Sequence, residues 1–209
     1  GFKVLKAENT TIKFVDTATM PDGISGTNLF DWHGDMISGY AVIQPKAITA
    51  GGVIPTPTET VEPTPTATVE PTALPEDAYV AMELDKTEVE VGDIITGTIK
   101  INNIKNFSGY QLNIKYDPTV LEAVDLETGE AIEGRTMPVV GGTVQQNENY
   151  GPTSIVANNI AAGILNFGST YSYLADYRAS GKAEETGIIG KVGFKVLKAE
   201  NTTIKFVDT

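Results

Sequence analysis

The sequence predicts an all-β fold, either a β-sandwich or a jelly roll, with one short helix. Apolar and polar residues alternate in most of the segments that lie between turns, and a period of two is typical of strands with one face in a core. Turn residues separate these segments at the spacing expected of such folds. The composition, with 41% hydrophobic and 20% charged residues, is that of an ordinary globular domain.

One segment of the chain occurs twice. GFKVLKAENTTIKFVDT forms residues 1–17 and recurs without substitution as residues 193–209. The separation of the copies is the size of one globular module plus a spacer, and too long for a solenoid of short units. We therefore interpret the chain as a piece of a tandem array. On this interpretation, residues 1–50 are the C-terminal strands of one module and residues 78–209 are the N-terminal and central strands of the next.

Residues 51–77 differ in kind from the rest. They contain six of the eleven prolines, no aromatic residue and no basic residue. Alternating proline and threonine favour polyproline II, and the segment lacks the apolar surface needed to offset the entropy of ordering. We interpret it as a linker between modules, long enough to connect residue 50 back to residue 78 within one molecule.

The elements expected before the linker are two strands, a loop and a third strand. Residues 1–7 and 10–16 alternate and are interpreted as a β-hairpin; in the second copy, Ile188, Gly190, Val192, Phe194 and Val196 are expected to share the core face. Residues 17–35 are expected to form an apolar loop that either covers the end of a core or is offered to a partner. Residues 37–48 return to strand, and Pro45 should end the ladder or mark an edge.

After the linker, the pattern predicts strands over 79–84, 93–103, 109–116, 120–124, 154–160 and 163–171, and a helix over 172–180. Within 109–116, alternation directs Tyr110, Leu112 and Ile114 to the core and Gln111 and Asn113 outward.

Several function classes find little support. A net charge of −12 without a basic stripe argues against nucleic acid as a partner. The chain has no cysteine and one histidine, His33, so a thiolate site, a histidine-based zinc site and a catalytic triad have no residues to form them. We predict no catalytic group, no bound metal or cofactor, and no direct insertion into a membrane, because no apolar run approaches roughly 18 residues.

Three stretches of the sequence resemble a known family. VGDIITGTIKINNIKNFSGYQLNIKYDPTVLEAVD is similar to the first strands of a cohesin module, the receptor domain of cellulosome scaffoldins. AEETGIIGKVGFKVL and MPDGISGTNLFDWHGDMISGYAVIQP are similar to type II cohesins, which belong to anchoring scaffoldins on the surface of cellulose-degrading anaerobic bacteria. The resemblance covers residues 78–209 and 1–50, in an order that splits one native module.

The resemblance implies a nine-stranded jelly-roll β-sandwich with one short helix insertion, here in split order like a circular permutant. It also implies a function: binding a type II dockerin, a small module loaded with Ca²⁺, to attach cellulosome components to the bacterial cell surface. The expected location is therefore extracellular, and calcium is expected in the dockerin rather than in this chain.

The family's dockerin face, transferred by alternation, gives the expected contact residues. If Leu165 and Phe167 are core residues, then Asn166, Gly168 and Thr170 face outward, and Gly168 permits a helix to approach closely. The alternation of 154–160 fits either phase, and we take Val156 and Asn158 as outward. The predicted dockerin-binding residues are Asp16, Met20, Leu29, Gln111, Asn113, Val156, Asn158, Asn166, Gly168 and Thr170.

Two further hypotheses remain open. A carbohydrate-binding β-sandwich could use Tyr171, Tyr173, Tyr177 and Trp32 as a stacking platform, although the clustered tyrosines favour burial. Separately, residues 1–17 and 193–209 compete for one position in one sandwich. We predict that one copy fills it and that the other is disordered, packed elsewhere, or exchanged with a second molecule as a swapped strand.

Overall fold

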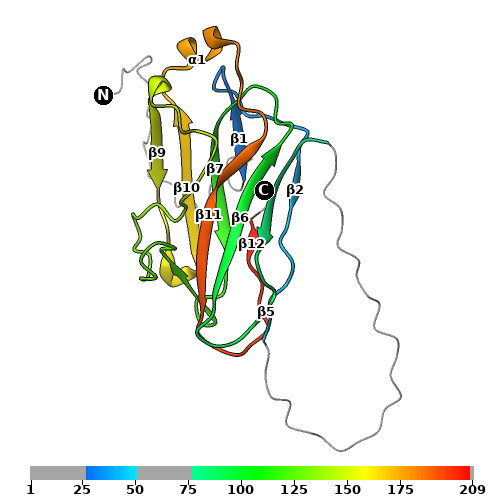
Figure 1. Cartoon of the computed structure of the whole chain (residues 1–209), viewed down its shortest axis with the longest axis vertical. Helices are drawn as coiled ribbons and strands as arrows, with labels where there is room; N and C mark the ends of the chain where they lie inside the picture. The colour runs from blue at the N-terminus through cyan, green and yellow to red at the C-terminus, as the bar shows by residue number, and fades with distance from the viewer. Residues whose placement is uncertain (1–26, 51–76, 208–209) are drawn as a thin grey trace, which may run out of the picture.

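Two five-stranded sheets face each other in the computed structural model, which describes residues 27–50 and 77–207 (Figure 1). Sheet A has the order β1 (Asn28–Asp31), β7 (Phe107–Lys115), β10 (Ile164–Tyr171) and β9 (Pro152–Val156), and β12 (Lys205–Phe206) also pairs with β7. Sheet B has the order β2 (Ala41–Ile43), β4 (Tyr79–Leu84), β6 (Ile94–Asn102), β11 (Gly187–Val196) and β8 (Leu121–Val124). The expected all-β sandwich is confirmed.

Two short strands, two 3-10 helices and one α-helix complete the described residues. β3 (Thr49–Ala50) pairs in parallel with β5 (Glu88–Val89), and two short 3-10 helices span Glu148–Tyr150 and Ile160–Ala162. The one α-helix, α1 (Leu174–Ser180), begins two residues later than expected and ends at Gly181, which adopts the left-handed conformation at φ 62°. None of the helices in these ranges has the length and hydropathy to cross a membrane.

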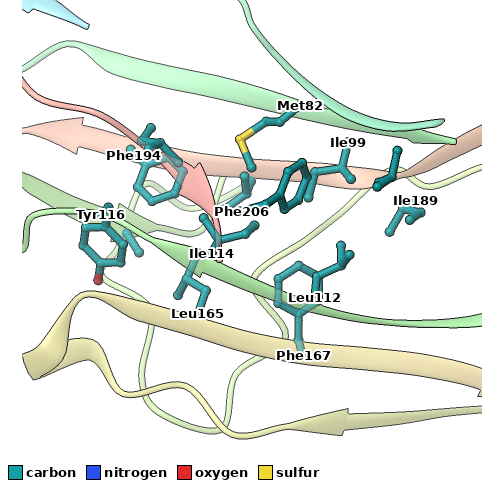
Figure 2. Close-up of a cluster of buried hydrophobic side chains, with 14 of the residues drawn as sticks. Met82, Ile99, Leu112, Ile114, Tyr116, Leu165, Phe167, Ile189, Phe194 and Phe206 are labelled. Carbon is teal, nitrogen blue, oxygen red and sulfur yellow. The ribbon is translucent and has the colours of Figure 1, made fainter. Parts of the chain in front are cut away.

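The core lies between the sheets and is built by alternating residues of both. Leu112, Leu165 and Phe167 point inward from sheet A toward Met82, Ile99 and Phe194 of sheet B (Figure 2). These side chains are 2% exposed or less. Tyr116 and Phe194 meet edge to face across the sandwich, with ring centroids 5.3 Å apart. Alternation thus selected the core face correctly in β7 and β10.

Residues 27–50 contribute a strand to each sheet. β1 pairs antiparallel with β7, with Leu29 opposite Tyr110, and β2 pairs in parallel with β4, with Val42 opposite Val80. Leu29 and Ile48 are buried in the common core. The segment that precedes residues 51–76 therefore completes the sandwich formed by the segment that follows them, which is the topology of a circular permutant.

The copy at 193–207 does not form the predicted hairpin. β11 pairs with β6 and β8 in sheet B, whereas β12 pairs with β7 in sheet A. The connection between them crosses from one sheet to the other, and Phe194 and Phe206 enter the same core from opposite sides (Figure 2). Alternation identified both strands but could not show that their hydrogen-bond partners lie elsewhere. The copy at 193–207 occupies this position, and the copy at 1–17 lies outside the described residues.

The expected core face of β11 is also wrong at its start. The register shifts between Ile188 and Gly190, and Ile189 rather than Ile188 joins the core with Val192 and Phe194. A β-bulge inserts one extra residue, so the strict period of two fails across it.

Candidate functional site

The candidate site is the side of sheet A that faces away from the core. Because Tyr110, Leu112, Phe167 and Leu29 point inward, the residues between them point away from the core. We use "outer face" for this set: Asn28, Phe30, Gly109, Gln111, Asn113, Lys115, Thr153, Ile155, Ile164, Asn166, Gly168, Thr170 and Lys205. Five of the predicted contact residues, Gln111, Asn113, Asn166, Gly168 and Thr170, belong to it.

An asparagine network joins β7 and β10 on the outer face, one outward position from Lys115. Asn166 Nδ2 donates to Asn113 Oδ1 at 2.5 Å, and the Asn166 backbone N–H donates to Asn158 Oδ1 at 3.0 Å. Asn158 Nδ2 in turn donates to the Thr136 carbonyl at 2.9 Å. Asn113 and Asn166 are only 5% and 2% exposed. Both side chains face away from the core as predicted. Their amides are hydrogen-bonded to each other, so they stabilise the face and have little surface left for contacts with a partner.

Gly168 creates a shallow place beside this network. It lies opposite Gln111 on one side and Ile155 on the other. A Cβ at residue 168 would stand 2.5 Å from the Tyr110 carbonyl oxygen, closer than such atoms approach. The glycine is therefore required by the β7–β10 packing itself, in addition to any approach by a partner that it permits.

Ile155 is the prominent side chain of the outer face. It is 70% exposed, the largest exposed fraction among the large hydrophobic side chains of the described residues. Ile155 projects into solvent next to a glycine, which has no side chain. Covering exposed aliphatic surface of this kind with a partner is favourable in free energy. The sequence prediction missed this residue.

The outward orientation predicted for two of the contact residues is wrong. Val156 lies opposite Phe167 and packs against the core, because the β9 phase is the reverse of the one chosen. Leu29 is fully buried opposite Tyr110. The signal that would have corrected β9 is its pairing with β10, which the sequence does not reveal. Asn158 lies just beyond β9 and is half-buried; Asp16 and Met20 lie outside the described residues.

The aromatic platform of the carbohydrate hypothesis loses two of its four rings, because Tyr171 and Tyr177 are buried, whereas Tyr173 is 56% exposed and Trp32 is partly buried. Tyr171 and Tyr177 are 1% and 0% exposed, with ring centroids 4.9 Å apart. The Tyr171 hydroxyl donates to Glu184 Oε1 at 2.9 Å, and the Tyr177 hydroxyl donates to the Phe107 carbonyl at 2.8 Å. Burial raises the pKa of Tyr177 to about 12. These rings anchor α1 to the sandwich and cannot stack on a sugar.

His33 has a local structural role. Its backbone N–H donates to Asp31 Oδ1 at 2.8 Å, and its Nδ1 lies 3.3 Å from Asp31 Oδ2. The backbone hydrogen bonds from His33 and Asp35 hold the pKa of Asp31 below its usual range against the opposing effect of burial. Within 27–50 and 77–207, no cluster of three or more histidine, aspartate or glutamate residues is placed to hold a metal ion.

The two-sheet fold and its exposed outer face are those of a β-sandwich interaction module. Comparison with known proteins agrees with this class. The family model described as "Cohesin domain" matches residues 80–209. The chain belongs to the cohesin family, whose modules are non-catalytic protein-interaction domains.

A curated relative is Cell surface glycoprotein 1 of Acetivibrio thermocellus, which is 61% identical over 219 residues. The match covers 100% of this chain and 10% of that protein, so the chain spans about a tenth of its relative.

Similar solved structures are type II cohesin modules. The second type II cohesin module of the cellulosomal adaptor ScaA scaffoldin of Acetivibrio cellulolyticus is 49% identical, with a TM-score of 0.60 over 63% of this chain and 77% of that one. A type II cohesin dyad of the same scaffoldin is 44% identical, with a TM-score of 0.62 over 93% and 51%. A third is an N-terminal interface mutant of a type II Cohesin-X-Dockerin complex from the same organism, at 48% identity and a TM-score of 0.61 over 64% and 79%.

Proposed function

We propose that the outer face of sheet A binds a type II dockerin, and that the chain thereby attaches cellulosome components to the bacterial cell surface. The family, the cell-surface relative and the similar complex that contains a dockerin support this function. The observation that carries it is the exposed Ile155 beside Gly168.

The chemistry of the face suits a helical partner. β7, β10 and β9 present Gln111, Gly168 and Ile155 in one row across the sheet. A helix that lies across the strands can place small apolar side chains over Gly168 and cover Ile155. Apolar side chains that become buried near the centre of an interface contribute most of the binding free energy. The expected calcium belongs to the dockerin, so binding should require Ca²⁺ in the buffer.

The test replaces Ile155 with lysine in the full chain. Ile155→Lys should weaken binding of the Acetivibrio cellulolyticus X-Dockerin by at least tenfold in calorimetric titration, because a charge replaces apolar surface in the contact. Val91→Lys is the matched control: Val91 is 60% exposed but lies outside sheet A, and this change should leave the affinity within twofold.

Two outcomes would contradict the proposal. One is a parent chain that fails to bind X-Dockerin in the presence of Ca²⁺. The other is binding of insoluble cellulose by the same protein in a pull-down, with no dockerin binding, which would favour the carbohydrate hypothesis despite the buried tyrosines.

The repeated segment supports a second, separate interaction, between copies of this chain. Residues 193–207 provide β12 and the end of β11, and residues 1–17 have the same sequence. We propose that residues 1–17 of one molecule can replace 193–209 of another. Light scattering over a range of concentrations should then detect dimers or larger species, whereas a monomer at every concentration would contradict the exchange.

A further inference from the structure

The outer face of sheet A carries no carboxylate, although the chain as a whole has 27 acidic residues and a net charge of −12. Its charged members are Lys115 and Lys205. Sheet B differs: on its outer side the Lys100 ammonium lies 2.5 Å from Glu83, and Lys195 lies opposite Glu122. The charged residues of the outer face are therefore both positive, and both lie at the same end of the sheet.

The two lysines are direct neighbours. Lys205 of β12 and Lys115 of β7 are Cα partners in the antiparallel ladder, so their side chains leave the same face side by side. The Lys115 ammonium donates to the Ala162 carbonyl. Among the residues that the structure describes, neither lysine has a carboxylate within ion-pair distance. Like charges directly opposite each other are unfavourable, and a bound carboxylate would relieve the repulsion.

A groove of about 710 Å³ opens at this end of the sheet and is lined by both lysines, Asn201, Thr202 and Asp117. Asp117 is turned to its own loop, where its Oδ1 accepts from the Thr119 hydroxyl and N–H at 2.8 Å each. These hydrogen bonds lower the pKa of Asp117, and the positive charges of Lys198 and Lys115 lower it further by a smaller amount. The groove thus contains two lysines and one carboxylate that is already hydrogen-bonded to Thr119, and it is large enough to admit a side chain of a partner.

We propose that Lys115 and Lys205 bind a carboxylate side chain of the docked dockerin and so fix which of its ends lies at this end of sheet A. The proposal rests on the function proposed above and names a subsite for it. Contacts with Ile155 and Gly168 contribute affinity without direction, whereas a cation pair at one end makes the two orientations of a helical partner unequal. Two lysines are too few to bind a polyanion by counterion release.

The first test reverses one charge in the full chain. At 50 mM NaCl, Lys205→Glu should slow association of the Acetivibrio cellulolyticus X-Dockerin roughly threefold to tenfold, and the difference should shrink below about twofold at 500 mM NaCl. Lys191→Glu is the control, because it makes the same charge change at an exposed residue of β11, in sheet B. Equal association rates for the two variants would overturn the subsite and leave the proposed function intact.

The second test locates the contact directly. Carbodiimide joins an ammonium to a carboxylate only when the two are in contact, so cross-linking of the complex followed by peptide mass spectrometry should recover Lys205 or Lys115 joined to an acidic residue of X-Dockerin. Cross-links at other lysines only would overturn the subsite. If the parent chain does not bind X-Dockerin at either salt concentration, the proposed function fails and this subsite fails with it.

Discussion

The side-chain amide of Gln44 engages both backbone polar groups of Phe206. The Phe206 N–H donates to Gln44 Oε1 at 2.7 Å, and Gln44 Nε2 donates to the Phe206 carbonyl at 3.0 Å. A primary amide thus occupies the place of a neighbouring strand on the side of β12 that faces away from β7. Together with the Ile48–Thr202 bridge, it ties the segment before residue 51 to the end of the chain.

Gln44→Ala should lower the free energy of unfolding by about 1–2 kcal/mol, because it removes two hydrogen bonds and leaves the edge of β12 without a partner there. The measurement is the urea midpoint at constant m-value. Gln146→Ala is the control, since that amide donates only to the Val144 carbonyl two residues away; it should cost less than about 0.5 kcal/mol. Equal losses would show that the bridge to β12 contributes nothing special.

Cleavage between residues 50 and 77 should leave one folded particle. A protease site placed within 51–76 would cut the covalent connection but not the β1–β7 and β2–β4 ladders or the buried Leu29 and Ile48. The two pieces should co-elute at micromolar concentration, and the melting temperature should become concentration-dependent, because folding is then bimolecular. Separation of the pieces on size-exclusion chromatography would contradict the circular-permutant topology.

Gly168→Ala should destabilise the protein by about 1–3 kcal/mol, because the new methyl group meets the Tyr110 carbonyl oxygen and the backbone must shift. Gly134→Ala provides the comparison: its Cβ would lie 3.5 Å from the Asn158 carbonyl oxygen, an ordinary contact. Chemical denaturation of both variants distinguishes the two sites. A Gly168→Ala variant as stable as Gly134→Ala would mean that β7 and β10 can separate without cost.

Alkaline pH should unfold the protein through buried phenols. Burial raises the pKa of Tyr110 to about 12 from a reference of 10, so above pH 10 the unfolded chain holds fewer protons than the folded one. Stability is therefore intact below pH 10 and falls as the pH rises to about 12, by roughly 2–3 kcal/mol for this residue. Urea titrations from pH 8 to pH 11.5 should show this loss, and Tyr110→Phe should reduce the slope. An unchanged slope would assign the loss to other groups.

The alternation of apolar and polar residues was sufficient to assign the core-facing side of long, regular strands. It failed in strands whose core-facing side depends on which neighbouring strand they pair with. Tyr110, Leu112 and Ile114 could be assigned from sequence because β7 is long, regular and buried on one face. Val156 could not, since β9 is a short edge strand whose apolar residues fit either phase. Leu29 was expected at a binding surface because its loop-like surroundings concealed a four-residue strand paired with β7.

The sequence by itself determined that this chain is a β-sandwich of the cohesin family, because strand periodicity and family motifs are local properties of the chain. Only the tertiary structure showed that β11 and β12 join different sheets, that Ile155 stands exposed beside Gly168, and that Lys115 and Lys205 are neighbours. The physical reason is the same in each case. Hydrogen-bond partners and cross-strand neighbours are set by contacts between residues distant in sequence, and alternation within one strand carries no information about them.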